Sequence, residues 1–226
     1  MTKAKESAGR RAAEMIQSNT IVGLGTGSTV YFTLVRIAER IAEEGLSIRG
    51  VPTSIDTETK AREMGIPLTT LAEVEGLDLT IDGADEIDQQ FQMIKGGGGA
   101  LLREKVVAYA TQRQVIIVGR DKLVERLGTT FDLPVEVVPF AQPMVMREVQ
   151  RLGASPTTRL DGDAEYRTDN GNAILDCHFP SGIVDPGAME RELDAIPGVV
   201  ETGLFIGLAH VCVVGDEDGG CEVLER

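Results

Sequence analysis

Short apolar runs alternate with stretches of helical spacing through the first half of the chain. The apolar runs predict strands over residues 20–24, 47–51, 77–81 and 115–118. The helical spacing predicts helices over residues 3–17, 28–44, 57–64 and 99–110. Strands that are apolar throughout, with helices between them, are typical of a parallel sheet covered on both faces. The pattern therefore predicts an α/β fold with a mostly parallel open sheet of the Rossmann-like kind.

The pattern changes near Phe131. Strands are predicted at 133–138, 157–160, 165–168, 173–179 and 199–204, and helices at 143–152 and 186–195. This order resembles β-α-β-β-α-β and predicts a small α+β lobe of the split-βαβ kind. Residues 209–214 form a continuous apolar strand again. We therefore predict a main domain from residues 1–131 and 206–226, with residues 132–205 inserted as a second domain.

A glycine-rich segment lies between the first predicted strand and the helix after it. Its sequence is Gly23-Leu24-Gly25-Thr26-Gly27-Ser28-Thr29. Free N–H groups at a helix start attract phosphate, and the two hydroxyl residues can cap the helix. A dinucleotide fingerprint needs glycine where Ser28 stands, and a Walker A loop needs a lysine that is absent. The segment predicts a phosphate cradle, and a glycine-rich turn with a serine cap is the alternative.

Carboxylates follow the third predicted strand, at Asp82, Asp85 and Asp88. Ligands bind at the carboxyl ends of strands in open α/β sheets. The spacing does not match an EF-hand, and the chain has no other clustered ligands, so a magnesium site is an alternative that the sequence does not favour. These features point to catalytic roles for Asp82 and Asp85, and a solvated acidic turn is the alternative.

Lys95 precedes four consecutive glycines, and Glu104 follows them. Four glycines in a row are entropically costly to order, so they are expected where backbone approaches a ligand closely. Lys95 offers a positive charge, while Glu104 faces either this loop or solvent from the first part of a helix. Together with the carboxylates, the segment predicts a site for a small, anionic, oxygen-rich substrate.

The amino-acid composition narrows the classes of molecule that the protein can bind and the compartment in which it is expected. The 226 residues carry a formal net charge of −14, a field that repels nucleic acid and anionic membranes. Three cysteines without a Cys-x-x-Cys pair predict neither a disulfide framework nor a zinc site. The chain begins without an apolar signal stretch and has no apolar run of about 18 residues, so we expect a cytoplasmic protein. Only six of its basic residues are lysines and sixteen are arginines, which suggests either a salt-adapted protein or an ordinary acidic one.

At these motifs the chain resembles the type A ribose-5-phosphate isomerases over nearly its whole length. The resemblance is carried by the glycine-rich segment 23–29, Pro52-Thr53-Ser54, residues 82–88, 95–105 and 121–124, Gly171 to Asp176, and Ile196 to Glu201. It implies an aldose–ketose isomerase of the non-oxidative pentose phosphate pathway that uses neither metal nor cofactor. It also implies a homodimer or a homotetramer.

The resemblance assigns roles to individual residues. Glu104 matches the catalytic base, and Lys95, Asp82 and Asp85 match catalytic positions. The remaining positions match residues that bind the sugar phosphate: Thr26, Gly27, Ser28, Thr29, Gly83, Ala84, Gly96, Gly97, Gly98, Lys122 and, less distinctively, Lys5.

Other functions that occur on this type of sheet remain open at this point. One is a different sugar-phosphate isomerase, or a deaminase of amino-sugar phosphates. Another is a CoA transferase, although the sequence shows no second glycine-rich site for CoA. A third is a non-catalytic sugar-phosphate sensor, which usually carries a basic DNA-binding segment that this chain lacks.

Overall fold

The computed structural model describes residues 2–226, and its internal contacts divide the chain into two compact units. The first unit comprises residues 1–84, 103–122 and 208–226, and the second comprises residues 85–102 and 123–207. The sequence predicts a second domain of residues 132–205 only. Residues 85–102, 123–131 and 206–207 thus lie in the second unit and not, as the sequence predicts, in the first.

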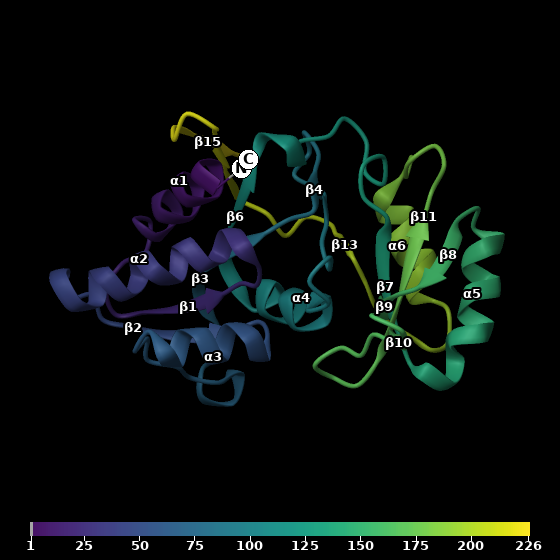
Figure 1. The fold of residues 1–226 in the computed structure, drawn as a ribbon, viewed down its shortest axis with the longest axis horizontal. Coiled ribbons are helices and arrows are strands. Elements are labelled where there is room, and N and C mark those ends of the chain that lie inside the picture. Colours follow the sequence, from purple (N-terminus) through teal and green to yellow (C-terminus); the bar gives the residue numbers. More distant parts are fainter. Residues whose placement is uncertain (1) are drawn as a thin grey trace. The chain divides into compact units, whose positions relative to one another are not determined.

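The first unit contains a six-stranded sheet (Figure 1). Neighbouring strands are parallel except at one edge, where the last pair is antiparallel. In spatial order the strands are β15 (Cys221–Glu225), β14 (Val211–Gly215), β6 (Thr111–Gly119), β3 (Leu77–Gly83), β1 (Thr20–Leu24) and β2 (Ile48–Pro52). The mostly parallel open sheet predicted from the apolar runs is confirmed. The pattern missed β15, because its residues are largely exposed at the sheet edge.

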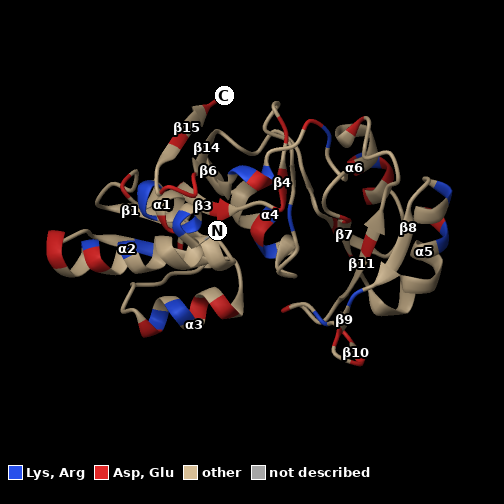
Figure 2. Cartoon of the chain, turned by 45° about the horizontal axis from the view of Figure 1, so that its top comes forward, with Lys and Arg blue, Asp and Glu red and all other residues tan. Residues whose placement is uncertain are grey.

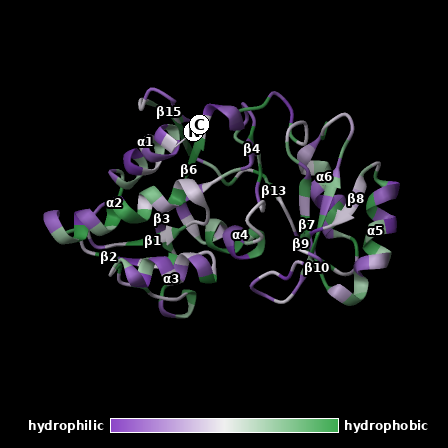
Figure 3. Ribbon diagram, in the orientation of Figure 1, coloured by the Kyte–Doolittle hydropathy of each residue, from purple (hydrophilic) through white to green (hydrophobic). Residues whose placement is uncertain are grey.

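Helices lie on both faces of this sheet (Figure 1). They are α1 (Thr2–Ala13), α2 (Ser28–Glu44), α3 (Ile55–Glu63) and α4 (Leu101–Tyr109), with short 3₁₀ turns η1 (Leu71–Glu73) and η2 (Arg120–Lys122). Side chains of α1 and α2 pack with Val22, Ile81 and Val213 in the larger core cluster. Val107 of α4 packs with apolar strand residues in a smaller cluster. The strands are mostly hydrophobic and the helices two-sided in Figure 3, as this layering requires.

Local signals fix where several helices begin and end. The Ser54 side chain accepts a hydrogen bond from Thr57 N and caps α3. Asp185 caps α6 (Pro186–Asp194) in the same way, through Ala188 N. At the end of α2, Gly45 has φ 71°, a left-handed conformation that glycine adopts without a Cβ penalty.

The second unit contains a four-stranded antiparallel sheet in the order β12-β7-β11-β8. Its strands are β7 (Leu133–Val137), β8 (Ser155–Thr158), β11 (Ala173–His178) and β12 (Val199–Thr202), joined with helices α5 (Gln142–Arg151) and α6; η3 (Pro139–Ala141) precedes α5. The chain order and strand order are those of a split βαβ motif, as predicted. The strand expected at 165–168 is instead the second half of a small hairpin, β9 (Leu160–Asp161) and β10 (Ala164–Glu165).

A three-stranded sheet explains why residues 85–102 belong to the second unit. It is formed by β4 (Glu86–Ile87), β5 (Met93–Ile94) and β13 (Leu204–Phe205), in the order β13-β5-β4. Each strand has two residues, too few for a period-two pattern to show in the sequence. The backbone of Lys95 extends the pairing, since its N–H donates to Gly203 O at 2.9 Å.

Within residues 2–226, none of the helices combines the length and the hydrophobicity that a membrane crossing requires.

The docking of α1 depends on a glycine at the end of β14. A Cβ on Gly215 would lie 1.9 Å from Ala4 O, a backbone atom that cannot swing aside. We expect Gly215→Ala to lower the free energy of unfolding by about 1–3 kcal/mol in urea titrations, because α1 must shift to accommodate the methyl group. Gly187→Ala in α6 is the matched control, since its Cβ would come no closer than 3.5 Å to any of its neighbours. Equal stability of the two variants would contradict the inferred close packing.

Candidate active site

The glycine-rich segment ends at the start of α2, in the first unit. Gly27 is the N-cap residue, with φ 114°, and no side chain caps the helix. The predicted capping by Ser28 or Thr29 is therefore wrong: Ser28 is the first helical residue. Its exposed hydroxyl instead accepts a hydrogen bond from Lys5 Nζ at 2.9 Å. A helix start without a side-chain cap, next to an ammonium group, suits a phosphate group.

The Thr26 side chain fixes this loop from within the first unit. Its hydroxyl lies 2.8 Å from Thr53 Oγ1 and 2.8 Å from Ser54 Oγ. Thr57 Oγ1 joins the same cluster and donates to Gly25 O at 2.7 Å. These hydroxyls come from the Pro52–Ser54 motif and the start of α3. The motif is visible in the sequence, but its contact with Thr26 is not.

Asp82 lies beneath the same loop. The residue is fully buried, and its Oδ1 accepts hydrogen bonds from Thr26 N at 3.0 Å and Gly83 N at 2.8 Å. A Cβ on Gly25 would lie 2.3 Å from this oxygen, so the close approach requires glycine. Gly83 and Ala84 are half-buried at the end of β3. The structure thus brings together the predicted residues 26–29 and 82–84 within the first unit.

Glu104 also belongs to the first unit, in the first turn of α4. The sequence left open whether its carboxylate faces the glycine loop or solvent. Only 4% of the residue is exposed, which excludes the solvated position. Burying a carboxylate costs free energy, so a buried glutamate in a region of candidate ligand-binding residues is a strong candidate for chemistry. Lys122, at the end of η2, is more accessible, with 37% of its side chain exposed and Nζ 3.9 Å from Asp121 Oδ2.

The second unit holds Asp85 and the glycine run. Asp85 Oδ2 accepts a hydrogen bond from Gly97 N at 2.8 Å. A Cβ on Gly97 would lie 2.7 Å from Asp85 Oδ1, so this contact also requires glycine. Gly97 and Gly98 are exposed, whereas Gly96 and Gly99 on either side are buried. The loop therefore presents the peptide groups at its centre.

Lys95 is almost completely buried, with 2% of the residue exposed. Its Nζ lies 5.3 Å from the centroid of the Phe205 ring, within the range of a cation–π contact. An ammonium group is costly to remove from water, so a lysine is seldom buried without a structural or chemical role. Burial of a lysine two residues before the first exposed glycine fits a role in the site.

Asp88 belongs to a turn and not to the chemistry. Its Oδ1 accepts hydrogen bonds from Gln90 N and Gln92 N, both at 2.9 Å, and closes the connection between β4 and β5. Burial raises the pKa of this carboxyl group, while the two backbone hydrogen bonds lower it. The predicted run of three strand-end aspartates therefore divides into two candidate site residues and one that builds the turn.

Sequence reasoning gave no role to Glu86, although it directly follows the candidate residue Asp85. It is fully buried and accepts hydrogen bonds from Gly128 N, Thr130 N, Thr130 Oγ1 and Phe131 N. These partners follow it by more than forty residues, so no local pattern could have revealed them.

The structure shows no candidate metal site among residues 2–226. No three or more His, Cys, Asp or Glu side chains lie close enough together there to hold a metal ion.

Known proteins of one family match most of the chain. The family model of ribose 5-phosphate isomerase A (phosphoriboisomerase A) matches residues 49–219. The ribose-5-phosphate isomerase A of Bacillus mycoides is 47% identical over 219 residues, covering 97% of this chain and 98% of the relative. That of Gloeobacter violaceus is 50% identical over 221 residues, covering 97% and 95%.

Solved structures match over the same extent. The ribose 5-phosphate isomerase of Plasmodium falciparum superposes with a TM-score of 0.96 at 36% identity, covering 100% of this chain and 99% of that one. A D-ribose-5-phosphate isomerase in complex with phospho-erythronic acid superposes with a TM-score of 0.94 at 37% identity, covering 98% and 97%.

Proposed function

The chain belongs to the ribose 5-phosphate isomerase A family, and on this premise we propose that it interconverts D-ribose 5-phosphate and D-ribulose 5-phosphate. The reaction is an aldose–ketose isomerisation, in the non-oxidative branch of the pentose phosphate pathway. One observation carries the proposal: the chain buries a lysine and a glutamate, Lys95 and Glu104, immediately before and shortly after a single glycine loop. A sensor that only binds sugar phosphate has no need of a buried base.

Glu104 is the proposed base of the isomerisation. Its carboxylate removes the proton from C2 of the open-chain aldose, leaving a cis-enediolate. It then delivers the proton to C1, which yields the ketose. One carboxylate can serve both steps, as a glutamate does in triosephosphate isomerase.

Lys95, Asp82 and Asp85 complete the proposed machinery. The negative charge that develops on the enediolate oxygens needs a fixed positive partner, and the Lys95 ammonium supplies it. The two aspartates bind substrate hydroxyls and move a proton between O2 and O1, so that every proton removed is returned. Asp82 is held in place for this by two backbone N–H groups.

The phosphate group anchors the substrate away from the reacting carbons. Lys5 and the N-terminus of α2, with Gly27, Ser28 and Thr29, are the proposed anchor. Gly83, Ala84, Gly96, Gly97, Gly98 and Lys122 are proposed to complete the binding surface. Remote binding of this kind lowers the entropic cost of bringing C1 and C2 to the base.

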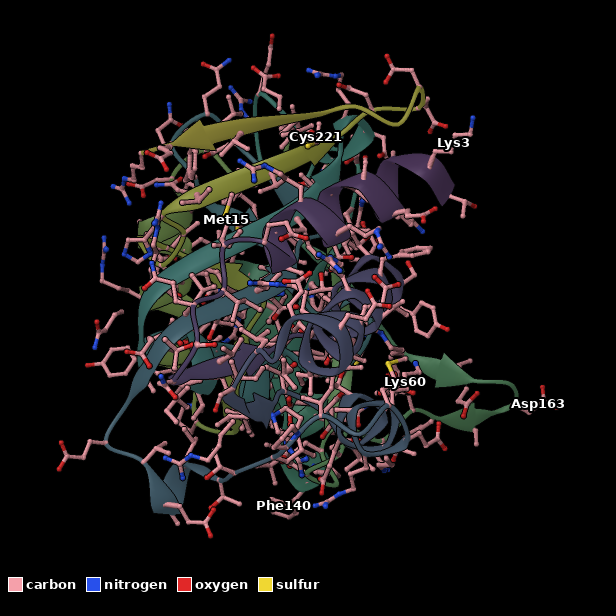
Figure 4. The ribbon with its side chains drawn as sticks, turned by 90° about the vertical axis from the view of Figure 1, so that its left-hand side faces the viewer. Lys3, Met15, Lys60, Phe140, Asp163 and Cys221 are labelled. Carbon is pink, nitrogen blue, oxygen red and sulfur yellow. The ribbon has the colours of Figure 1, made fainter. Side chains whose placement is uncertain are left out.

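Family membership also supports a cytoplasmic location and assembly into a homodimer or homotetramer. Each unit exposes apolar side chains of the type found in interfaces: Tyr109 in the first, and Phe140 and Val184 in the second. Phe140 is 97% exposed and carries a label in Figure 4.

We further propose that the protein is adapted to high salt. Its net charge is −14, and acidic residues lie along helices and strands of both units (Figure 2). Arginine in place of lysine provides most of its positive charge. Like-charge repulsion across such a surface is relieved when salt screens it.

The base assignment is tested in heavy water. With ribose 5-phosphate, the unaltered protein should incorporate solvent deuterium at C1 or C2 and form ribulose 5-phosphate. Glu104→Gln should lower kcat by about 10²–10⁴-fold, because the amide cannot take up the proton. Glu63→Gln makes the same change on an exposed helical residue of the first unit and should be neutral. No ribulose 5-phosphate formed by the unaltered protein would refute the isomerase, and an active Glu104→Gln would refute only the base.

Replacing Lys95 should impair the chemical step. Lys95→Met retains most of the buried stem without the charge, and we expect kcat to fall by about 10²–10³-fold in steady-state kinetics. Lys95→Arg should also be impaired, because a planar forked guanidinium does not replace a compact ammonium. Lys60→Met, at an exposed position of α3, is the control. Unchanged kcat and KM in Lys95→Met would remove this lysine from the mechanism.

Thermal melts test the adaptation to salt. Raising KCl from dilute buffer to about 1 M shortens the Debye length to about 3 Å. If repulsion between carboxylates limits stability, Tm should rise by several degrees over this range and approach a plateau as screening is completed. A Tm that is constant or falls would identify an ordinary acidic protein.

A further inference from the structure

Three consecutive carbonyl groups of the glycine run lie against two side chains from a distant segment of the second unit. Arg159 Nη1 donates to Gly96 O at 2.7 Å and to Gly97 O at 3.2 Å. Tyr166 Oη donates a longer hydrogen bond, 3.5 Å, to Gly98 O. The run is thus held from its carbonyl side at every one of the three glycines proposed to bind substrate.

Arg159 is itself held in a fixed orientation. Its Nε donates to Asp176 Oδ2 at 3.0 Å, and its Nη2 donates to Asp176 Oδ1 at 2.5 Å. This two-point contact leaves Nη1 directed at the glycine carbonyls. Both side chains are largely shielded from solvent, with 14% and 23% exposed, so the pair is less screened than a surface ion pair.

Tyr166 further limits the movement of the Arg159 side chain and of the glycine run. Its ring centroid lies 5.9 Å from Arg159 Cζ, and its backbone N–H donates to Arg159 O at 2.9 Å. A Cβ on Gly99 would lie 2.1 Å from its hydroxyl, so the phenol packs directly on the run. Burial raises the pKa of Tyr166, against the opposing effect of the Arg159 charge, and this keeps its hydroxyl protonated as a donor. The β9–β10 hairpin, with Asp163 at its turn in Figure 4, joins the two residues.

The carbonyl contacts determine where the N–H groups point. In a trans peptide the C=O and N–H bonds are antiparallel, and the described residues contain no cis peptide. Fixing Gly96 O and Gly97 O against Arg159 therefore directs Gly97 N–H and Gly98 N–H to the opposite side. Gly97 N–H indeed donates to Asp85 Oδ2 there. Glycine peptides rotate easily, so without such contacts the run would sample many orientations.

We propose that Arg159, oriented by Asp176 and Tyr166, is a positioning residue that keeps Gly97 N–H on Asp85 and turns the N–H group of Gly98 toward the oxygens of the sugar phosphate at its reacting end. The inference rests on the proposed isomerase function. Arg159 touches no substrate atom itself. It acts by holding the Gly98 peptide, whose N–H bond stabilises negative charge as it develops on the enediolate, and the Gly97 peptide, whose N–H bond holds Asp85.

Three substitutions test the proposal. Arg159→Ala removes the contacts to Gly96 O and Gly97 O, and Asp176→Asn removes the charge that orients the guanidinium. Arg159→Lys keeps a positive charge but cannot reach Asp176 and two carbonyls together. The control is Arg167→Ala, which breaks the exposed pair with Glu165 in the same segment without altering any contact of the glycine run.

Steady-state kinetics of ribose 5-phosphate isomerisation provide the readout, with circular dichroism and urea titration reporting the folded fraction. We expect kcat to fall by about 10–100-fold in Arg159→Ala, Arg159→Lys and Asp176→Asn, since small misplacements of binding groups have effects of this size. KM should change less than threefold, because the residues proposed to bind the phosphate group are not altered. Millimolar guanidinium ion should restore part of the activity of Arg159→Ala, whereas Arg167→Ala should match the unaltered protein without it.

The outcomes separate the positioning role from a structural one and from the function itself. A kcat within twofold of the unaltered protein, in folded Arg159→Ala or in Arg159→Lys, overturns the proposal. A loss of activity that follows only the folded fraction also overturns it. If Arg159→Ala does not fold, Arg159→Lys and Asp176→Asn decide the question. An unaltered protein that does not isomerise ribose 5-phosphate refutes the proposed function, whatever the variants show.

Discussion

The site depends on carboxylates that accept hydrogen bonds from backbone N–H groups. Four of the seven residues from 82 to 88 are acidic, and each holds a different loop or turn in place. A carboxylate that accepts such bonds is compensated for part of the solvation that it loses on burial. The pairs are Asp82 with Thr26 and Gly83, Asp85 with Gly97, Glu86 with Gly128, Thr130 and Phe131, and Asp88 with Gln90 and Gln92. One short segment therefore organises loops in both units.

This arrangement explains why glycine is required where it is. Gly25 and Gly97 each bring backbone within van der Waals distance of an aspartate, at separations that a Cβ would violate. The glycines thus serve the acidic residues as much as any ligand. It also explains how an acidic protein can be expected to bind an anion: the carboxylates nearest the loops are occupied by N–H groups, and buried or helix-borne lysines supply local positive charge.

The sequence predicted most of the first unit because its signals are local. The apolar run 20–24 and the helix beginning at Ser28 were placed at their observed bounds. Two-residue strands such as β4 and β5 were missed because tertiary pairing creates them. The assignment of residues 85–102 to the second unit was missed for the same reason.

The candidate site divides in the same way between local and distant signals. Glycines, strand-end aspartates and the lysine before the glycine run can be recognised by residue type and spacing. The burial of Glu104 could not be predicted, because its position in the helix was compatible with either environment. Arg159 gave no signal at all, since it is 63 positions from the glycine that it contacts.

The position of Lys5 on the first helix links ligand affinity to local unfolding. The helix is docked through Gly215, and it carries Lys5 to the start of α2. If Lys5 binds the substrate phosphate as proposed, the opening of α1 takes one charge away from the phosphate group, and the open form binds ligand more weakly than the closed form. Ligand binding must then make the opening of α1 less favourable, by the difference in binding free energy between the closed and the open form. Amide hydrogens of α1 would exchange more slowly in the presence of substrate, although most of them lie outside the site.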